Sequence, residues 1–378
     1  MLDPVELAAE LIRIRSPSGS EGDLADFLIR TLRRFMDVER GPLGAVVGRL
    51  QRGEGPTVAL EGHMDTVPPG DEASWSVAPY AGAVEEGLLY GRGAVDMKGA
   101  IAAQIAGVAA AQREVQGTLY LVYVTHEESA EGIVLGRVFE EIGLPDLVIL
   151  GEPTDLRLGI GHRGRAIVRL VAKGRAAHAA MPELGVNAVE KLLRELPRAL
   201  QRELPRDPLL GKGTQAVTSV STPTSGPIIP DRCVAEIDRR ILPGETRDSV
   251  LGTYKGLELE VGIAKGELRS YTGEAFLVEY FFPAWVFPPQ EGFIQWAWQA
   301  LGRPPFRIWR FSTDGVMSAG VLGIPTFGYG PGEESLAHQA DEHVPVGDIA
   351  RAAEGYRKLV TRMGELSRIP LRRGGLGG

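Results

Sequence analysis

Apolar residues near the N-terminus recur at the spacing of helices. One helix is predicted to begin at Asp3-Pro4 and to end before the Ser-Pro-Ser-Gly run at 16–19. Its apolar positions on one face are Val5, Leu7, Leu11 and Ile12. Residues 24–35 repeat the pattern and predict a second amphipathic helix.

Continuous apolar runs follow. Residues 118–125 and 147–150 are apolar throughout, which indicates strands covered on both faces. Shorter runs at 45–50 and 57–61 predict further strands, and the small apolar residues of 100–111 predict a buried helix. This part of the chain therefore reads as an α/β domain.

The pattern changes near residue 161. From 165–173 onward, apolar and polar residues alternate, which is typical of strands in a sheet with one apolar and one polar face. Helices are predicted at 187–200 and 247–255, with strands at 215–220, 233–239 and 257–263. This β-α-β-β-α-β order predicts a small α+β domain inserted into the first. The predicted division is 1–161, first part of the main domain; 162–274, inserted domain; and 275–378, second part of the main domain.

Two stretches have unusual composition. Residues 280–309 carry four of the five tryptophans together with several prolines. We interpret them as packing where the chain re-enters the main domain, with a substrate pocket as the alternative. The glycine-rich end, 372–378, is predicted to be disordered.

Composition narrows the class of protein. The 378 residues are 44% hydrophobic and 24% charged, which is typical of a globular enzyme of about two domains. A net charge of −8 argues against nucleic-acid binding. The single cysteine excludes an internal disulfide, and the sequence shows no signal pattern and no apolar run of about 20 residues. We therefore expect a cytoplasmic protein that does not insert into a membrane.

Metal-capable side chains follow the predicted strands. His63 and Asp65 come directly after the strand at 57–61, and Asp96 lies in a loop rich in glycine. Open α/β sheets bind ligands at such strand ends. Asp65 is too close to His63 in sequence to share its metal easily, so we expect its carboxylate to accept the other ring N–H of His63 and orient the imidazole.

Two histidines and three carboxylates complete a candidate metal centre. His338 follows a glycine-rich turn, and Glu128 and Glu152 lie just after the apolar runs. With His63 and Asp96 they provide the mixed nitrogen and oxygen ligands that zinc or cobalt takes. The sequence thus predicts two divalent ions per chain, Zn or Co.

Five ordered motifs carry a resemblance to a known family. They are GHMDTVP at 62–68, GRGAVDMKG at 91–99, the Glu127-Glu128 pair, GEPT at 151–154 and AHQADE at 337–342. Together they resemble the M20 family of dinuclear metallopeptidases and deacylases, over about residues 1–365. The resemblance implies a zinc-peptidase-like catalytic domain with a mixed central sheet, and an inserted α+β lid that also serves dimerisation.

The resemblance also implies roles. It assigns the ligands in two sets: His63, Asp96 and Glu152 for one ion, and Asp96, Glu128 and His338 for the other. Glu127 is the implied general base, which deprotonates the attacking water and later protonates the leaving amine. His178 is the implied oxyanion donor, reaching the partner subunit's site in dimeric members.

Substrate contacts are implied as well. Arg240 matches a position that binds substrate carboxylate. Ser312 and Thr313 resemble a substrate-binding loop, with a helix N-cap as the alternative reading. Two positions depart from the family: His126 stands where relatives commonly have Asp, and Pro227 where they often have Asn.

Within the family, the compact chain looks most like deacylases of lysine and arginine biosynthesis. The implied substrate is lysine, or ornithine, bound through its amino group to the terminal glutamate of an acidic carrier protein. Basic residues that could meet such a carrier are Lys191, Arg194, Arg198, Arg202, Arg206 and Lys212. Charged helix faces are usually only exposed to solvent, so these residues form either a docking surface for the carrier or an ordinary solvated surface.

Other activities stay open from the sequence. Small substrates such as N-acetylornithine or N-succinyl-diaminopimelate are alternatives, as are dipeptides and carboxypeptidase substrates. A non-catalytic binding module is the remote alternative, because every expected ligand type is present.

Overall fold

The computed structural model describes residues 2–371, so the tail predicted to be disordered lies outside the described part. The chain forms two compact units. The first contains the residues up to 162, then 268–276, and those from 286 onward; the second contains 163–267 and 277–285. After residue 267 the chain thus passes to the first unit, back to the second and again to the first. The sequence had suggested one boundary, after residue 274.

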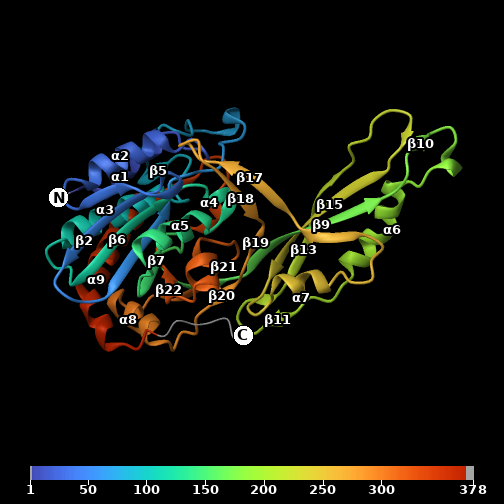
Figure 1. Cartoon of the computed structure of the whole chain (residues 1–378). Helices are drawn as coiled ribbons and strands as arrows, with labels where there is room; N and C mark the ends of the chain where they lie inside the picture. The colour runs from blue at the N-terminus through green and yellow to red at the C-terminus, as the bar shows by residue number, and fades with distance from the viewer. Residues whose placement is uncertain (1, 372–378) are drawn as a thin grey trace. The chain divides into compact units, whose positions relative to one another are not determined.

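A mixed nine-stranded sheet forms the centre of the first unit (Figure 1). Its order is β1-β2-β6-β3-β7-β22-β8-β20, and β21 also pairs with β8. Its strands are β1 (Asp37–Arg40), β2 (Val46–Arg52), β3 (Thr57–His63), β6 (Gly117–Val124), β7 (Leu147–Leu150), β8 (Leu158–His162), β20 (Trp285–Val286), β21 (Phe306–Trp309) and β22 (Thr326–Gly328).

The middle of this sheet is parallel. β3 runs parallel to both β6 and β7, and β7 is parallel to β22. The residues that follow β3, β6 and β7 therefore meet at one edge of the sheet. That edge is where the sequence placed the candidate site.

Helices cover both faces of the sheet. One hydrophobic core joins the sheet to α1 (Pro4–Arg13), α2 (Gly22–Leu32), α3 (Lys98–Ala111), α8 (Gly292–Ala300) and α9 (Val346–Arg362). α5 (Ile133–Ile142) packs against β6. α1 begins as predicted, because the Asp3 carboxylate accepts the N–H groups of Val5 and Glu6. α3 is apolar on all sides, as a helix buried between α1 and α9 should be.

Short elements complete the first unit. They are α4 (Glu127–Ala130), the hairpin β4 (Ala83–Glu85) and β5 (Leu88–Tyr90), β23 (His343–Pro345) beside β5, and the helical turns η1 (Pro42–Gly44), η2 (Glu72–Ser74), η4 (Val316–Val321), η5 (Glu334–Leu336) and η6 (Met363–Arg368). β17 (Lys265–Arg269) and β18 (Ala275–Glu279) pair where the chain alternates between the units.

The second unit has its own core and an antiparallel sheet in the order β13-β15-β9-β16, with β19 beside β9. These strands are β9 (Gly164–Lys173), β13 (Thr214–Ser221), β15 (Arg232–Ile241), β16 (Glu260–Ile263) and β19 (Phe281–Phe282). The unit also contains α6 (Ala188–Leu200), α7 (Arg247–Gly252), η3 (Pro182–Leu184) and the short pairs β10 (Ala177–His178) with β14 (Ile228–Ile229) and β11 (Arg206–Asp207) with β12 (Gly211–Lys212). Side chains of β9, β15, α6 and α7 form its core.

The predicted fold class, an α/β domain with a mixed sheet and a second α+β unit, is confirmed. The helix predicted at 24–35 is shorter and ends at Leu32. In the aromatic stretch, Trp309 is buried against Gly159 and Gly328, and its indole N–H donates to the carbonyl of Pro153 at 2.7 Å, which supports the packing interpretation for that tryptophan. Among the described residues, no helix is both long and apolar enough to cross a membrane.

Candidate metal centre

The ends of the parallel strands β3, β6 and β7 place metal-capable side chains close together. His63 is the last residue of β3, Glu152 follows β7 by two residues, and the Glu127-Glu128 pair starts α4 shortly after β6. His63, Glu127 and Glu152 offer ligand atoms that all lie within 4.8 Å of one another. The parallel sheet therefore brings together residues up to 89 positions apart in the sequence, from His63 to Glu152.

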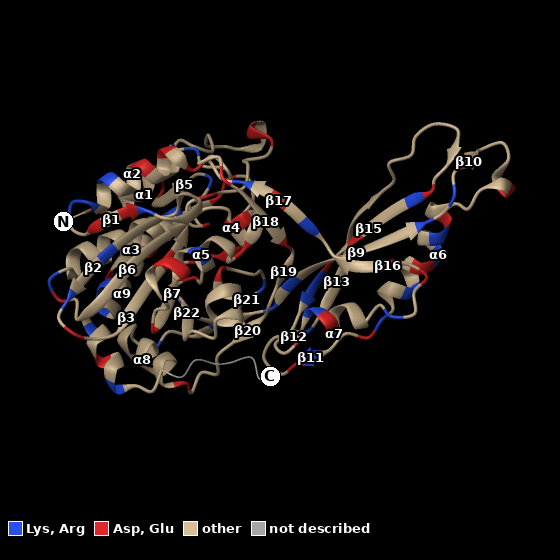
Figure 2. Ribbon diagram, in the orientation of Figure 1, with Lys and Arg blue, Asp and Glu red and all other residues tan. Residues whose placement is uncertain are grey.

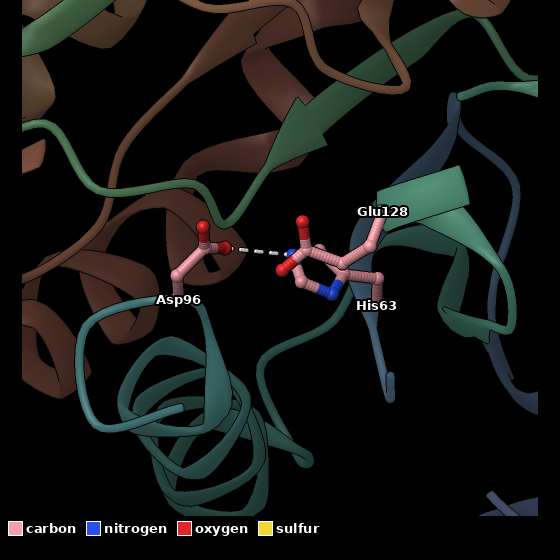
Figure 3. Close-up of side chains that lie close together, drawn as sticks. All are labelled: His63, Asp96 and Glu128. Carbon is pink, nitrogen blue, oxygen red and sulfur yellow. Dashed lines mark hydrogen bonds and ion pairs between the residues drawn. The ribbon is translucent and has the colours of Figure 1, made fainter. Parts of the chain in front are cut away.

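Asp96 lies between the two histidines. Its Oδ1 is 2.8 Å from Nε2 of His63, and its Oδ2 is 3.2 Å from Nε2 of His338. Figure 3 shows the Asp96 carboxylate pointing from the loop before α3 toward the His63 ring. A carboxylate that offers one oxygen to each histidine has the arrangement of a ligand that bridges two ions.

Glu128 lies beside His338, and Glu152 lies beside His63. Nε2 of His338 is 3.0 Å from Oε2 of Glu128, while Nε2 of His63 is 3.9 Å from Oε1 of Glu152. His63, Asp96 and Glu128 form a second group with ligand atoms within 4.8 Å (Figure 3). All five predicted ligands thus gather in one cluster.

The cluster has the chemistry of a cation site. Its carboxylates are largely buried, and the cationic partners found for them are the two histidines. Oε2 of Glu152 is buried with no partner among the described residues. Buried, uncompensated carboxylates are costly unless a cation binds them. Two histidines with three carboxylates form the nitrogen and oxygen set that suits zinc or cobalt.

The pKa values of these residues reflect the close packing of charged groups in the cluster. Hydrogen bonds to Asp96 and Glu128 raise the pKa of His338 to about 10. Burial opposes ionisation of Asp96, but the bonds from His338 and His63 outweigh it and hold the pKa of Asp96 below its usual value. Burial, with repulsion from Asp96, raises the pKa of Glu152. Cations that enter here must therefore displace protons from the histidines.

Glu127 is the buried member of the acidic pair. Its residue is 6% exposed, and burial raises the pKa of its carboxyl well above the usual range, with neighbouring carboxylates adding to the rise. Its backbone N–H donates to Oδ1 of Asp65 at 3.0 Å. A carboxyl group with a raised pKa can both take and return a proton near neutral pH.

Asp65 acts differently from the sequence-based expectation. The Nδ1 atom of His63 bonds to the main-chain oxygen of Asp65 at 2.8 Å, whereas the carboxylate Oδ1 lies 3.8 Å away. The carboxylate instead accepts the N–H groups of Glu127 and Glu128, at 3.0 and 3.2 Å, and the hydroxyl of Ser18 at 2.6 Å. The main-chain oxygen of Asp65 therefore serves the His63 ring, and its side chain serves α4.

His126, one of the two positions where the sequence departs from the resemblance, has a packing role. Its backbone is left-handed, with φ 60°, and its ring bonds to Oγ of Ser129 and to the carbonyl of Arg269, at 3.0 and 3.2 Å. The ring also meets Phe276 edge-on, with centroids 5.2 Å apart. His126 therefore ties the residues before Glu127 to the segment at 268–276.

The loop at Ser312 and Thr313 is anchored inside the first unit. The Ser312 hydroxyl donates to Oε1 of Glu131 at 2.8 Å, and the Thr313 N–H donates to Nε2 of His162 at 3.1 Å. The Thr313 hydroxyl also accepts the N–H of Gly315 at 3.1 Å, a capping bond directly before the helical turn η4, so the N-cap reading stays open beside the substrate-loop reading. His162, for which no role was predicted, positions this loop.

Two predicted site residues, His178 and Arg240, belong to the second unit. His178 lies on β10 and is exposed, and its Nδ1 accepts the N–H of Ala180 at 3.0 Å. Arg240 binds Asp238 with two hydrogen bonds, at 2.9 and 3.2 Å. The neighbouring Arg239 is buried and forms an ion pair with Glu245, which makes it a structural residue.

Three further buried acidic residues were not predicted as part of the site. Glu61 is buried on β3 next to Asp314, and burial raises the pKa of Asp314 to about 7. Glu342 is buried against Arg92 and the loop that carries Asp96. Glu342 ends the AHQADE run and could have been noted there, whereas nothing in the sequence marks the pairing of Glu61 with Asp314.

Comparison with known proteins identifies the family. The profile of "Peptidase family M20/M25/M40" matches residues 59–362. The uncharacterized protein YgeY of Escherichia coli is 33% identical, over 94% of this chain and 93% of its own. A succinyl-diaminopimelate desuccinylase of Acidiphilium cryptum is 32% identical, over 96% of this chain and 98% of its own.

Two more relatives bear on activity and fold. A protein of Pyrobaculum aerophilum described as a putative [LysW]-lysine/[LysW]-ornithine hydrolase is 30% identical, over 97% of this chain and 99% of its own. The crystal structure of an M20 family metallo-carboxypeptidase from Sulfolobus solfataricus has the same fold, with a TM-score of 0.73 at 18% identity, over 97% of this chain and 100% of that chain. The chain belongs to peptidase family M20/M25/M40 and is a metal-dependent hydrolase of that family.

Proposed function

We propose that this enzyme releases lysine, and also ornithine, from an acylated amino group, with the terminal glutamate of an amino-group carrier protein as the acyl donor. The reaction is hydrolysis of a linear amide in lysine and arginine biosynthesis. The observation that carries the hydrolytic part is the Asp96 carboxylate, which offers one oxygen to His63 and the other to His338 beside the buried Glu127.

Each half of the centre holds one divalent cation, zinc or cobalt. The ligand sets are His63, Asp96 and Glu152 for one cation, and Asp96, Glu128 and His338 for the other. When bound, the two cations supply Lewis-acid polarisation of the scissile carbonyl and lower the pKa of water. The main-chain oxygen of Asp65, bonded to Nδ1 of His63, leaves Nε2 of that ring as the ligand atom.

Glu127 moves the protons. Its carboxylate takes a proton from the attacking water and gives it to the nitrogen of the departing amine, so the amide C–N bond is replaced by a C–O bond. The buried surroundings that raise its pKa make the carboxyl a competent acid for the second transfer. Asp65 holds the Glu127 backbone in place through its N–H.

His178 stabilises the oxyanion of the tetrahedral intermediate. Because Nδ1 of its ring accepts the N–H of Ala180, the neutral ring carries its proton on Nε2 and can donate it in a hydrogen bond. Arg240 binds a substrate carboxylate, and the loop at Ser312 and Thr313 contacts the substrate. Pro227 lacks the side-chain amide of relatives, so these residues act without that donor.

The enzyme is a homodimer that associates through the second unit, so that His178 of one subunit serves the other. Several large apolar side chains near His178 are exposed: Met181 at 44%, Leu184 at 57%, Val186 at 45% and Ile228 at 47%. Apolar side chains gathered on an exposed surface are typical of an interface with a second copy.

The carrier protein as acyl donor rests on the kinship with the Pyrobaculum hydrolase. α6 carries both charge signs in Figure 2, and one basic residue of the helix and one that follows it already have partners. Arg198 is paired with Glu195, and Arg202, just after the helix, donates to the carbonyl of Lys255. Lys191 and Arg194 are the remaining basic residues of α6 for contact with an acidic carrier in the cytoplasm.

The test compares three substrates at equal enzyme and cation concentration. We expect the highest kcat/KM for lysine released from carrier protein, below it succinyl-diaminopimelate, and the lowest value for N-acetylornithine. A much higher kcat/KM on succinyl-diaminopimelate would instead favour the second candidate, a desuccinylase like the Acidiphilium relative. Peptides with free and blocked C-termini test the dipeptidase and carboxypeptidase alternatives.

A further inference from the structure

The loop that carries Asp96 is folded around a single buried carboxylate, that of Glu342. Oε1 of Glu342 accepts the N–H groups of Val95 and Asp96, at 2.8 and 3.0 Å. Oε2 accepts the N–H of Gly93 at 3.1 Å and the guanidinium of Arg92 at 2.6 Å. Three convergent backbone N–H groups and one arginine form a concavity for an anion, and the Glu342 side chain fills it.

The same residue is tied to the segment that carries His338. Glu342 follows His338 by four residues, and its main-chain oxygen accepts the N–H of Gly91 at 2.9 Å. The next residues form β23, which pairs with β5 directly before the loop. Glu342 thus fixes the spacing between the two segments whose side chains, Asp96 and His338, are 3.2 Å apart.

Arg92 keeps this carboxylate compensated. The Arg92 residue is 2% exposed, and its guanidinium also lies 5.2 Å from the ring centre of Trp75. A buried carboxylate without such a partner would be costly, and so would the buried loop N–H groups without the carboxylate. The Arg92–Glu342 pair is therefore a structural part of the loop. Each oxygen of the Glu342 carboxylate already accepts two hydrogen bonds.

We propose that Glu342 is a positioning residue for the metal centre: it sets the backbone of residues 93–96 so that the Asp96 carboxylate presents one oxygen to each half of the centre. This inference rests on the proposed function, because it assumes that Asp96 bridges two cations. The carboxylate of Glu342 bonds to Arg92 and to the N–H groups of the loop. Its effect passes through the backbone N–H of Asp96.

The test is a Co2+ titration of the metal-free full chain, followed by visible absorption and by competition with a chelator. In Glu342→Gln the amide oxygen can still accept two N–H groups, but the NH2 group faces Gly93 and Arg92, which are donors. We expect at least one of the two cations to bind about 10- to 100-fold more weakly, with an altered absorption spectrum. Glu342→Asp, which keeps the charge and shortens the side chain, is the second variant if the first does not fold.

A matched control is available in the second unit. Glu245 forms an ion pair with Arg239 at 2.5 Å and accepts the N–H of Leu242, so Glu245→Gln removes a comparable pair away from the cluster. Glu245→Gln should lower thermal stability and leave the Co2+ titration unchanged. Identical titrations of wild type and the Glu342 variants would overturn the positioning role. A wild-type chain that binds fewer than two cations would overturn the proposed function itself.

Discussion

The carboxylate of Asp65 accepts the backbone N–H of Glu127 at 3.0 Å, across 62 positions of the sequence. The same carboxylate accepts the N–H of Glu128 at 3.2 Å. One side chain after β3 therefore holds both acidic residues of α4. The imidazole of His63 is oriented by the main chain of Asp65, so the carboxylate serves Glu127, the proposed general base, and its neighbour Glu128.

Replacing Asp65 by Asn should impair turnover without unfolding the chain. The amide can accept only one of the two N–H groups through its oxygen, and its NH2 group faces the other as a second donor. We expect kcat to fall about 10- to 100-fold, measured at saturating substrate and cation. Ser18→Ala, which removes only the hydroxyl donor to the same carboxylate, should have a smaller effect. Equal kcat for Asp65→Asn and wild type would show that the N–H bonds do not matter.

Arg240 should bind a substrate carboxylate only in competition with Asp238. The guanidinium is already bonded to Asp238 through two hydrogen bonds, and it is 26% exposed. Asp238→Asn should therefore lower KM for a succinylated substrate, and Arg240→Met should raise it about tenfold, the loss of one charged hydrogen bond. Arg169→Met, which removes an arginine 4.0 Å from Glu236 on the same sheet, is the control. An unchanged KM for both variants would remove Arg240 from the substrate site.

His178→Ala should lower kcat more than it raises KM. The Nε2 donor is useful only when negative charge develops on the oxygen of the reacting carbonyl, so its loss affects the transition state. We expect kcat to fall about 100-fold, measured with the preferred substrate. An increase confined to KM would instead identify His178 as a contact of the bound substrate.

Glu21 should make the stability of the metal-free chain depend on pH. Its Oε1 accepts the N–H groups of Gly19 and His126, while Oε2 is buried with no partner among the described residues. Burial, with the charge of Asp65, raises its pKa from 4.5 to about 7. Between these values the folded chain binds more protons than the unfolded chain, so the free energy of unfolding falls as the pH rises.

Glu21→Gln should remove that contribution. The slope in this window is about 1.4 kcal/mol per pH unit for one group, and we expect urea denaturation in chelator to show a flatter profile for the variant. Glu10→Gln, which removes an exposed carboxylate of α1, controls for the loss of one charge. Parallel profiles for wild type and Glu21→Gln would contradict the prediction.

The positions of some ligand residues followed from the sequence because they lie beside strongly patterned strands, whereas Asp96 and His338 lie in loops and were predicted from their motifs. His63 and Glu152 follow apolar strands, and the strand order of a parallel sheet brings such ends together. The structure gathers the five residues, and their roles as ligands stay predictions. The pairing of Arg240 with Asp238 is also consistent with the sequence, because residues two apart on a strand point to the same face of the sheet.

Other contacts depend on turns that the sequence does not specify. The carboxylate of Asp65 reaches α4 only because the chain takes a left-handed conformation at His126 before Glu127. The environment of Glu342 likewise depends on how the loop after Gly91 closes. Such long-range hydrogen bonds follow from the packed fold, whereas apolar periodicity reports only local structure and burial.

The most direct test returns Zn2+ or Co2+ to chelator-treated enzyme and measures amide hydrolysis against the number of cations bound per chain, for wild type and Glu127→Gln. We predict no turnover without cations, a plateau at two cations per chain, and a Glu127→Gln variant that binds the same two cations with kcat lower by about 100- to 10,000-fold. Undiminished hydrolysis after removal of the cations, or near-normal kcat in Glu127→Gln, would contradict the account.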